Sequence, residues 1–328
     1  MRVLFITSNR IGDAVLSTGL INHLIRQNED LQLTLACGRV ASPLFVKMPC
    51  LERLIPLEKR PLAQHWRKLW WEVLWARWDL VVDLRDSALA YLLWAQRRLV
   101  YRPRDDGTHR VIQLSQFFGL NDPAAPGLWL GEQQVNKARS FIPHGGLVLG
   151  VGPTANWGGK QWAAGKFAEV VLRLTAPGAI LDGARVAVFG AQSERAAALP
   201  LLERIPRKSR IDLVGRCDIL TSAACLQECS MFIGNDSGLM HLAAAVYTPT
   251  LGLFGPSRED LYAPWGPHCA VARTSASYAV LSKMPEFHPD RNDSLMDSLS
   301  IGVVESAAID LWRTVHPEES TSAAKVGH

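Results

Sequence analysis

The chain has 328 residues, of which 48% are hydrophobic and 20% charged, a composition that is typical of a folded globular protein and excludes a disordered one. This length suffices for two domains of ordinary size. The formal net charge is +4, and it is unevenly shared: residues 1–145 hold 19 Lys and Arg against 13 Asp and Glu, and the rest hold 16 against 18. The basic first half predicts either an anionic partner or membrane surface on that side, or a solvated face without a partner.

The longest apolar run, at 88–95, is far too short to span a membrane, and the first residues turn polar too soon for a signal peptide. The six cysteines are scattered, which is typical of reduced thiols in the cytosol. Cys225 and Cys229 stand close together, but no second pair with zinc spacing accompanies them. We therefore predict a cytoplasmic protein without a metal or cofactor, and we expect no nucleic-acid partner.

Short β-rich runs alternate with helical stretches along the chain, which indicates parallel sheets with crossover helices. The expected strands are at 2–8, 31–37, 79–85, 98–102, 147–153, 184–190, 211–215, 230–236 and 249–255. The expected helices are at 14–27, 160–174, 193–205, 221–229, 237–247 and 301–312. Residues 270–300 lack periodicity and should form a loop.

The segment FIPHGG, at 141–146, is the expected linker because it combines a proline with paired glycines. We predict an N-terminal Rossmann-like acceptor domain at 1–143, a C-terminal Rossmann-like donor domain at 147–315, and a disordered tail at 316–328. The fold class is therefore α/β, with two Rossmann-like domains facing each other across a cleft.

Five tryptophans recur at helical spacing between residues 66 and 78, with Lys and Arg side chains among them. One interpretation is a helix whose aromatic stripe belongs to the core. The other is a helix that lies on a membrane surface, because Trp favours interfaces and cations favour anionic lipid.

The segment GNDSG, at 234–238, occupies a strand-to-helix turn. The free N–H groups and the positive dipole end of such a helix favour an anion, and the small Ser237 and Gly238 let a ligand approach the backbone. His241 lies one turn further along the same helix. The alternative is a simple N-cap by Asp236 or Ser237, followed by a core histidine.

A second polar turn, GPTANWGGKQW at 152–162, also lies between a strand and a helix. It departs from a P-loop at Thr154 and Gln161, so Lys160 is expected either to place a point charge on a phosphate or to be solvated. The third turn, SNRIGDAVLSTG, keeps only Gly12 of a dinucleotide fingerprint. Asp13 is there either the acid of a first helical turn or a general base.

These three turns and several other segments are similar to one family of sugar-transferring enzymes. The matching pieces are RIGDAVLST, DLVVDLR, KQWAAGKFAEV, VFGAQSE and GNDSGLMHLAAAVYTPTLGLFGPS. They resemble the ADP-heptose:lipopolysaccharide heptosyltransferases of glycosyltransferase family nine, which have the GT-B fold, over residues 1–258. Gly19 stands where members commonly have a proline, and Ser237 stands where threonine is more usual.

The resemblance implies an inverting glycosyl transfer that needs no metal. In the family, the acid of the GD motif is the catalytic base, which here falls on Asp13, and the lysine before the tryptophan, here Lys160, binds the donor phosphates. The resemblance also gives the residues of the nucleotide-sugar site: Thr154, Glu194, Asp236, Ser237, Gly238, Leu239 and His241.

The chemistry suits these residue types. An acceptor hydroxyl is a poor nucleophile, so a carboxylate must take its proton as it attacks. A diphosphate leaving group develops negative charge, which Lys160 and a helix N-terminus can stabilise. Arg10 and Arg85 neighbour the motifs and are candidates for binding an anionic acceptor.

We therefore predict a glycosyltransferase at the cytoplasmic face of the inner membrane. Its donor is expected to be a nucleotide sugar, ADP-heptose by resemblance, and its acceptor a lipopolysaccharide core or related glycolipid. A nucleotide-sugar epimerase and a catalytically silent nucleotide-sugar-binding protein are the alternatives, since such epimerases also use two facing Rossmann domains.

Overall fold

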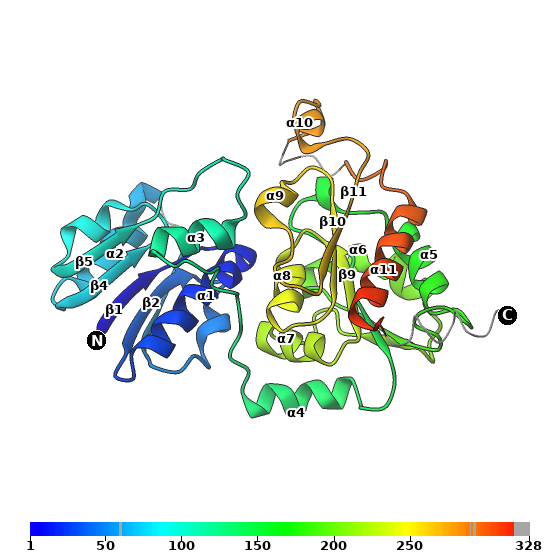
Figure 1. Ribbon diagram of the computed structural model, residues 1–328, viewed down its shortest axis with the longest axis horizontal. Coiled ribbons are helices and arrows are strands. Elements are labelled where there is room, and N and C mark those ends of the chain that lie inside the picture. The colour runs from blue at the N-terminus through cyan, green and yellow to red at the C-terminus, as the bar shows by residue number, and fades with distance from the viewer. Residues whose placement is uncertain (59–60, 289, 291–292, 318–328) are drawn as a thin grey trace. The chain divides into compact units, whose positions relative to one another are not determined.

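The computed structural model describes residues 1–58, 61–288, 290 and 293–317. The chain divides into two compact units, unit 1 (Met1–Gly131) and unit 2 (Glu132–His328) (Figure 1). Beyond its first two residues, the tail predicted to be disordered at 316–328 lies outside the described residues.

Unit 1 is built from alternating strands and helices, with η denoting a 3₁₀ helix. Its elements are β1 (Arg2–Ile6), α1 (Ile11–Gln27), β2 (Gln32–Gly38), η1 (Ser42–Phe45), β3 (Leu51–Leu57), η2 (Pro61–Ala63), α2 (Gln64–Val73), β4 (Trp78–Asp83), η3 (Ala88–Leu92), β5 (Ala95–Val100) and α3 (Arg110–Phe118).

Unit 2 repeats the alternation. Its elements are α4 (Glu132–Phe141), β6 (Val148–Gly152), η4 (Gly158–Lys160), α5 (Ala164–Leu174), β7 (Arg185–Val188), η5 (Gln192–Glu194), α6 (Arg195–Arg204), β8 (Arg210–Asp212), α7 (Ile219–Gln227), β9 (Met231–Asn235), α8 (Gly238–Ala245), β10 (Thr250–Phe254), α9 (Glu259–Tyr262), β11 (Cys269–Arg273), α10 (Tyr278–Leu281) and α11 (Ile301–Val315).

Each unit holds one parallel sheet with the Rossmann strand order. The sheet of unit 1 runs β3-β2-β1-β4-β5, and the sheet of unit 2 runs β11-β10-β9-β6-β7-β8. In both, the first strand of the unit lies in the middle and the order reverses beside it, between β1 and β4 and between β6 and β9. Ligands of such sheets bind beyond the carboxyl ends of the strands at this reversal point.

The strands are apolar runs because helices cover both faces of each sheet. Val3–Ile6 of β1 and Met231–Ile233 of β9 are essentially inaccessible to solvent. In unit 2, α5, α6 and α11 pack on one face and α7 and α8 on the other (Figure 1). The loops at the carboxyl ends of the strands are therefore anchored to a tightly packed core in each unit.

Most predicted elements are confirmed with boundaries shifted by a few residues. The expectation of a loop over 270–300 is wrong at its start, where β11 pairs with β10, and at α10. The sequence pattern also missed β3, α3 and α4. The strand β3 alternates exposed charged residues and a proline with partly buried ones, which is typical of an edge strand and obscures its periodicity.

The division between the units comes earlier in the chain than the linker expected at 141–146. The helix α4 belongs to unit 2 because it packs on α7. Lys137 lies 3.9 Å from the Asp218 carboxylate, and the Arg216 guanidinium lies over the Phe141 ring.

The tryptophan-rich segment is not one continuous helix. The helix α2 ends at Val73, and Trp78 begins β4, where it is buried. Trp66 and Trp70 pack partly against the core of unit 1, whereas Trp71 and Trp75 are exposed. The core interpretation therefore holds for only part of the stripe. Among the described residues, no helix combines the length and apolar character needed to cross a bilayer.

Gly19 occupies a position without room for a side chain. A Cβ there would overlap the carbonyl oxygen of Ala124, because the backbone at 124–125 crosses α1 at this point. This close approach accounts for the glycine at this position.

Candidate active site

The loop after β6 and the loop after β9 meet at the reversal point of the second sheet, and Asn235 fastens them together. This fully buried residue is the last of β9. Its amide nitrogen donates to the Pro153 carbonyl at 2.8 Å, and its amide oxygen accepts the Trp162 N–H at 3.0 Å. Asn235 thus holds both ends of the segment that carries Thr154 and Lys160.

Lys160 and Asp236 form an ion pair across these two loops. The ammonium of Lys160 lies 2.5 Å from Oδ2 of Asp236, and the Lys160 side chain is 24% exposed against 9% for Asp236. Lys160 ends the 3₁₀ helix η4, and α5 begins only at Ala164. The prediction that Lys160 lies within the helix is therefore wrong. A Cβ at Gly159 would lie 2.5 Å from the Trp157 ring, so this glycine lets the ring pack against the turn that carries Lys160.

The N-terminus of α8 lacks a side-chain cap. Ser237 occupies the N-cap position with extended backbone, but its hydroxyl makes no capping bond. The hydroxyl oxygen is buried and finds no hydrogen-bond partner among the described residues. The simple N-cap interpretation is therefore wrong for Ser237. Three further predicted residues lie on this helix: Gly238, Leu239 and the buried His241.

Thr154 and Glu194 both lie next to Gly190. A Cβ at Gly190 would be 3.6 Å from the Thr154 hydroxyl and 3.5 Å from Oε2 of Glu194. That oxygen of Glu194 also accepts the Ala191 N–H at 2.7 Å, which fixes the carboxylate at the start of η5. The Thr154 hydroxyl is buried and, within the part of the chain that is described, has no hydrogen-bond partner. The structure therefore brings these two predicted residues close together.

In unit 1, Asp13 lies in the first turn of α1, immediately beyond the carboxyl end of β1. The Ser8 hydroxyl donates to the Asp13 carboxylate at 3.4 Å and also accepts the N–H of Arg10 at 3.2 Å. The Arg10 side chain is exposed and makes no capping bond to α1. Asp13 is thus partly buried near the reversal point of the first sheet.

Arg85 contacts the loop after β1, which also carries Ser8 and Arg10. Its guanidinium donates to the Asn9 side-chain oxygen at 2.8 Å and lies over the Trp66 ring, 5.5 Å from the centroid. The Arg85 N–H donates to the fully buried carboxylate of Asp83, which also accepts the N–H and hydroxyl of Ser87. Burial, only partly offset by these hydrogen bonds, raises the pKa of Asp83. The loop after β4 therefore supports the loop after β1.

The sequence analysis included Asn235 in the segment GNDSG and Asp83 in the matching piece DLVVDLR, but it gave neither residue a role. Both end a buried strand, and both use a short polar side chain to bind the backbone of a loop. A polar residue at the last position of an otherwise apolar strand is the signal that could have identified them. The roles of the residues implied by the resemblance stay predictions.

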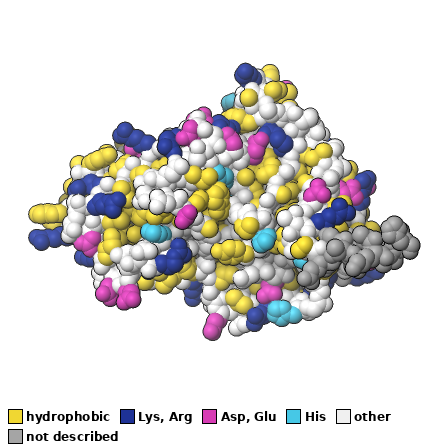
Figure 2. All heavy atoms as spheres, viewed as in Figure 1, with side chains coloured by type: hydrophobic (Ala, Val, Ile, Leu, Met, Phe, Trp, Pro, Cys, Tyr) yellow, Lys and Arg dark blue, Asp and Glu magenta, His cyan; other side chains and the backbone are white. Residues whose placement is uncertain are grey.

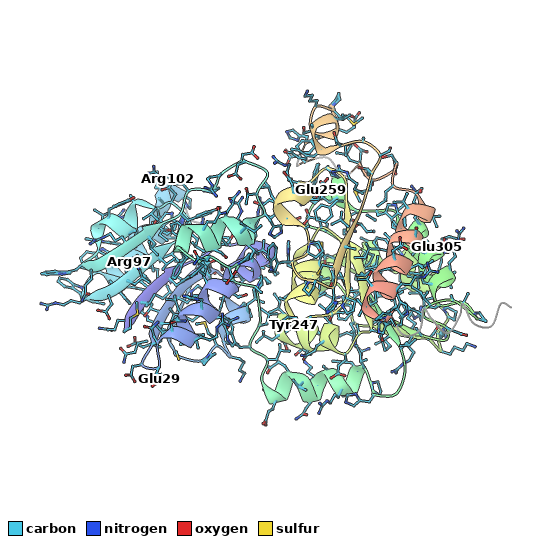
Figure 3. All side chains as sticks on the ribbon, viewed as in Figure 1. Glu29, Arg97, Arg102, Tyr247, Glu259 and Glu305 are labelled. Atoms are coloured by element: carbon cyan, nitrogen blue, oxygen red, sulfur yellow. The ribbon has the colours of Figure 1, made fainter. Side chains whose placement is uncertain are left out.

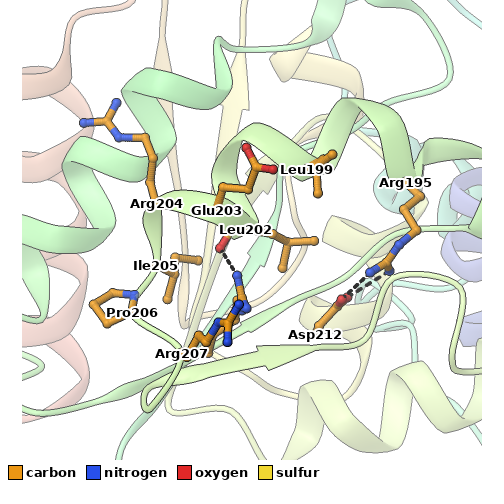
Figure 4. Close-up of a pocket in the computed structure, with 10 residues that line it drawn as sticks. Arg195, Leu199, Leu202, Glu203, Arg204, Ile205, Pro206, Arg207 and Asp212 are labelled. Atoms are coloured by element: carbon orange, nitrogen blue, oxygen red, sulfur yellow. Dashed lines mark hydrogen bonds and ion pairs between the residues drawn. The ribbon is translucent and has the colours of Figure 1, made fainter.

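Two cavities lie outside these loops. One, of about 450 Å³, lies beside α6 and β8, and its walls include Arg195 and Asp212 (Figure 4). Among the described residues that line it, none is a predicted site residue. Burial opposes ionisation of Asp212, but hydrogen bonds from Arg195 and Val214 hold the pKa of its carboxyl below the usual value.

The second cavity, of about 470 Å³, belongs to unit 1. It lies at the carboxyl ends of β2 and β3 beside α2, with Arg39, His65 and Lys68 in its wall along with Glu58 and Glu72. Over the described ranges, no three His, Cys, Asp or Glu side chains come close enough together to hold a metal ion.

Comparisons with known proteins point to one family of glycosyltransferases. A family model described as glycosyltransferase family 9 (heptosyltransferase) matches residues 84–288. The lipooligosaccharide heptosyltransferase 2 of Haemophilus influenzae is 22% identical over 90% of this chain and 95% of its own length.

Two solved structures share the fold. A glycosyl transferase of family 9 from Veillonella parvula superposes with a TM-score of 0.78 at 19% identity, over 95% of this chain and 97% of its own. The ADP-heptose lps heptosyltransferase II of E. coli gives a TM-score of 0.74 at 19% identity, over 96% of this chain and 100% of its own.

The predicted α/β class, with the two Rossmann-like units of a GT-B fold, is confirmed by the strand orders and by these structures. The predicted enzyme class, a glycosyltransferase, is confirmed by the family match, which sets aside the epimerase alternative. The family model spans well over half of the chain, including the loops after β6 and β9. The chain therefore belongs to glycosyltransferase family 9, the heptosyltransferase family.

Proposed function

We propose that the chain is an inverting heptosyltransferase that moves a heptose from ADP-heptose, without a metal ion, to a lipopolysaccharide core or related glycolipid. The relatives named above are lipooligosaccharide or lipopolysaccharide heptosyltransferases, and one is named for ADP-heptose. The observation that carries the proposal is the ion pair of Lys160 and Asp236 beside the uncapped N-terminus of α8.

This group of residues suits a nucleoside diphosphate. The Lys160 ammonium can donate charge-assisted hydrogen bonds to the phosphates, and the first N–H groups of α8 favour the same negative charge. The buried hydroxyls of Thr154 and Ser237 have no hydrogen-bond partner among the described residues, so they can serve the donor without breaking an existing bond. In the absence of donor, Asp236 holds Lys160 in position. Glu194 and His241 complete the proposed donor site.

In the proposed reaction Asp13 is the general base. The acceptor hydroxyl oxygen attacks the anomeric carbon while Asp13 takes its proton, and the bond from that carbon to the diphosphate oxygen breaks. A single displacement inverts the anomeric configuration. The electron pair leaves with ADP, and Lys160 and the α8 N-terminus stabilise its charge.

The acceptor is assigned to unit 1, which carries Asp13. Arg10 is the better candidate for a direct contact, because Arg85 is already engaged by Asn9 and the Trp66 ring. We place this reaction at the cytoplasmic face of the inner membrane, where a glycolipid acceptor would be presented.

The test is transfer of heptose to a purified acceptor, followed by mass spectrometry of the product. We expect Asp13→Ala to lower kcat by about 10²- to 10⁴-fold while leaving ADP affinity unchanged. The matched control is Glu29→Gln, an exposed acid of the same unit (Figure 3), which should retain full activity. Near-normal transfer by Asp13→Ala would remove the proposed base.

Two measurements test the donor site and the metal. Lys160→Ala should weaken ADP binding by about 10- to 100-fold, since it removes hydrogen bonds to a charged group. An unchanged ADP affinity would contradict the role of Lys160. EDTA should leave the rate unchanged, and a loss that a divalent ion restores would contradict metal independence. ADP binding without transfer to any acceptor would instead favour the catalytically silent binding protein.

A further inference from the structure

Large apolar side chains gather on one end of unit 1. They come from two segments, the end of α2 with the turn after it, and the stretch from η3 to the start of β5. We call these side chains the aromatic patch, and each is more than half exposed: Trp71, Trp75, Tyr91, Leu92 and Trp94. Trp75 and Trp94 are the most exposed of them, with exposed fractions of 81% and 70%.

Direct contacts join the two segments into one surface. The Trp70 indole N–H donates to the Leu92 carbonyl at 3.4 Å, and the Trp78 N–H donates to the Trp94 carbonyl at 3.0 Å. The Arg77 guanidinium lies over the Trp94 ring, 5.1 Å from its centroid. The two segments that carry the aromatic patch are therefore neighbours in the structure.

The patch does not replace core packing in α2. Leu69 and Val73 fill the core of unit 1 from the inner side of this helix. Trp71 follows Arg67 at i+4, so that both lie on one outer face. The helix thus buries one face completely and keeps its exposed tryptophan beside a cation.

Arginine side chains accompany the patch. Arg67 shares the outer face of α2 with Trp71, Arg77 lies over Trp94, and Arg97 is an exposed residue of β5. Figure 2 shows hydrophobic and Lys or Arg side chains side by side at the end of unit 1 that carries β4 and β5, where Figure 3 labels Arg97. The acids nearby are already engaged, because Glu72 pairs with Arg53 and Lys68, and Asp79 accepts from Arg2 and Gln96.

We propose that the aromatic patch is the surface by which unit 1 docks on an anionic lipid bilayer. Trp and Tyr favour the headgroup level, where an apolar ring and a polar tip are both solvated. Lys and Arg beside them are attracted by anionic lipid. Protein interfaces are also enriched in Trp, Tyr and Arg, so a second copy of the chain is the competing occupant that the test below distinguishes. The inference rests on the proposed function in one respect, that the acceptor is a membrane glycolipid.

The test is co-sedimentation of the full chain with vesicles of phosphatidylethanolamine and phosphatidylglycerol that contain no acceptor. Trp75→Ser with Trp94→Ser should lower the partition coefficient by about tenfold or more. Arg67→Gln with Arg77→Gln should lower it by about thirtyfold, and added salt should weaken wild-type binding.

Matched controls come from unit 2. Tyr247→Asn replaces an aromatic residue that is 68% exposed (Figure 3), and Lys208→Gln removes an exposed cation. Both should sediment like the wild type. Circular dichroism and an unchanged thermal midpoint verify that the patch variants are folded, as expected for exposed side chains.

Equal sedimentation of wild type and patch variants would overturn the proposal, as would equally tight binding to vesicles of phosphatidylcholine alone. A dimer that the Trp75→Ser, Trp94→Ser variant dissociates, with vesicle binding unchanged, would assign the patch to a second copy instead.

A second assay separates this proposal from the proposed function. With a water-soluble acceptor fragment the tryptophan variant should keep its kcat/KM, and with acceptor embedded in vesicles it should lose about tenfold. Absence of transfer in both formats would reject the proposed function, whereas the acceptor-free vesicles still decide the docking surface.

Discussion

Replacing Asn235 by alanine tests how the donor loop is held. The Asn235 side chain is inaccessible to solvent and bonds two backbone groups, the Trp162 N–H and the Pro153 carbonyl. In Asn235→Ala both groups stay buried without this partner, and each costs about 1–3 kcal/mol. Because the loop can relax in part, we expect the free energy of unfolding of unit 2 to fall by about 2–4 kcal/mol.

Hydrogen exchange at the Trp162 amide measures this effect locally. A loss of about 2 kcal/mol in the free energy of opening accelerates exchange by about thirtyfold. ADP should also bind more weakly, since the same loop carries Thr154 and Lys160. Asn22→Ala is the matched control, because the Asn22 amide donates at 3.3 Å to a carbonyl within unit 1 and should leave Trp162 exchange unchanged. Exchange at Trp162 within twofold of wild type in Asn235→Ala would refute the reasoning.

Three further outcomes follow from the packing and the charges. Gly19→Ala should lower the free energy of unfolding by at least about 2 kcal/mol, because the new Cβ would overlap a backbone oxygen. Gly302 has open space around it, so Gly302→Ala should stabilise α11 by up to about 1 kcal/mol. Equal urea midpoints for the two variants would contradict this expectation. The pKa of Asp212 lies below its usual 3.8, so its ion pair with Arg195 stabilises the fold above pH 3.8, and this stabilisation is lost as the pH falls through the lowered pKa. In Asp212→Asn the free energy of unfolding should therefore fall less steeply with decreasing pH at the acid end. An unchanged slope would contradict this expectation. When thiols are alkylated near pH 8 and mapped by mass spectrometry, Cys217 should be labelled before Cys37. A hydrogen bond from the neighbouring Cys225 thiol lowers the pKa of Cys217, whereas burial raises the pKa of Cys37 to about 12. Labelling in the reverse order would refute this expectation.

The polar turns show how far local pattern reaches. Runs such as Val3–Ile6 read as strands because both faces of a parallel sheet are covered, and a polar turn after such a run already marks a carboxyl end. Asp13 and Asp236 could be assigned to such turns for this reason, and the structure places both there. The strand order, by contrast, depends on which strands pair, and residue spacing does not encode it.

The tryptophan-rich segment shows where local pattern misleads. The helical spacing of the tryptophans continues from Trp66 to Trp78. Trp78 nevertheless lies in β4 and not in a helix, because it pairs with Ala95 of β5. Trp71 and Trp75 stay outside since Leu69 and Val73 already fill the space under α2. Which aromatic side chains are buried was therefore decided by packing against residues far along the chain.

By itself, the sequence determined the α/β class, the two-unit organisation and the turns that carry the candidate residues, because hydrophobic periodicity and short motifs are local properties. Only the tertiary structure decided that Lys160 pairs with Asp236, that Asn235 holds the loop after β6, and that Ser237 leaves its helix uncapped. The first two depend on distances between residues that are remote in the chain, and parallel pairing of β6 with β9 brings these residues within hydrogen-bond reach. The third depends on the side-chain orientation of Ser237, which residue type alone does not fix.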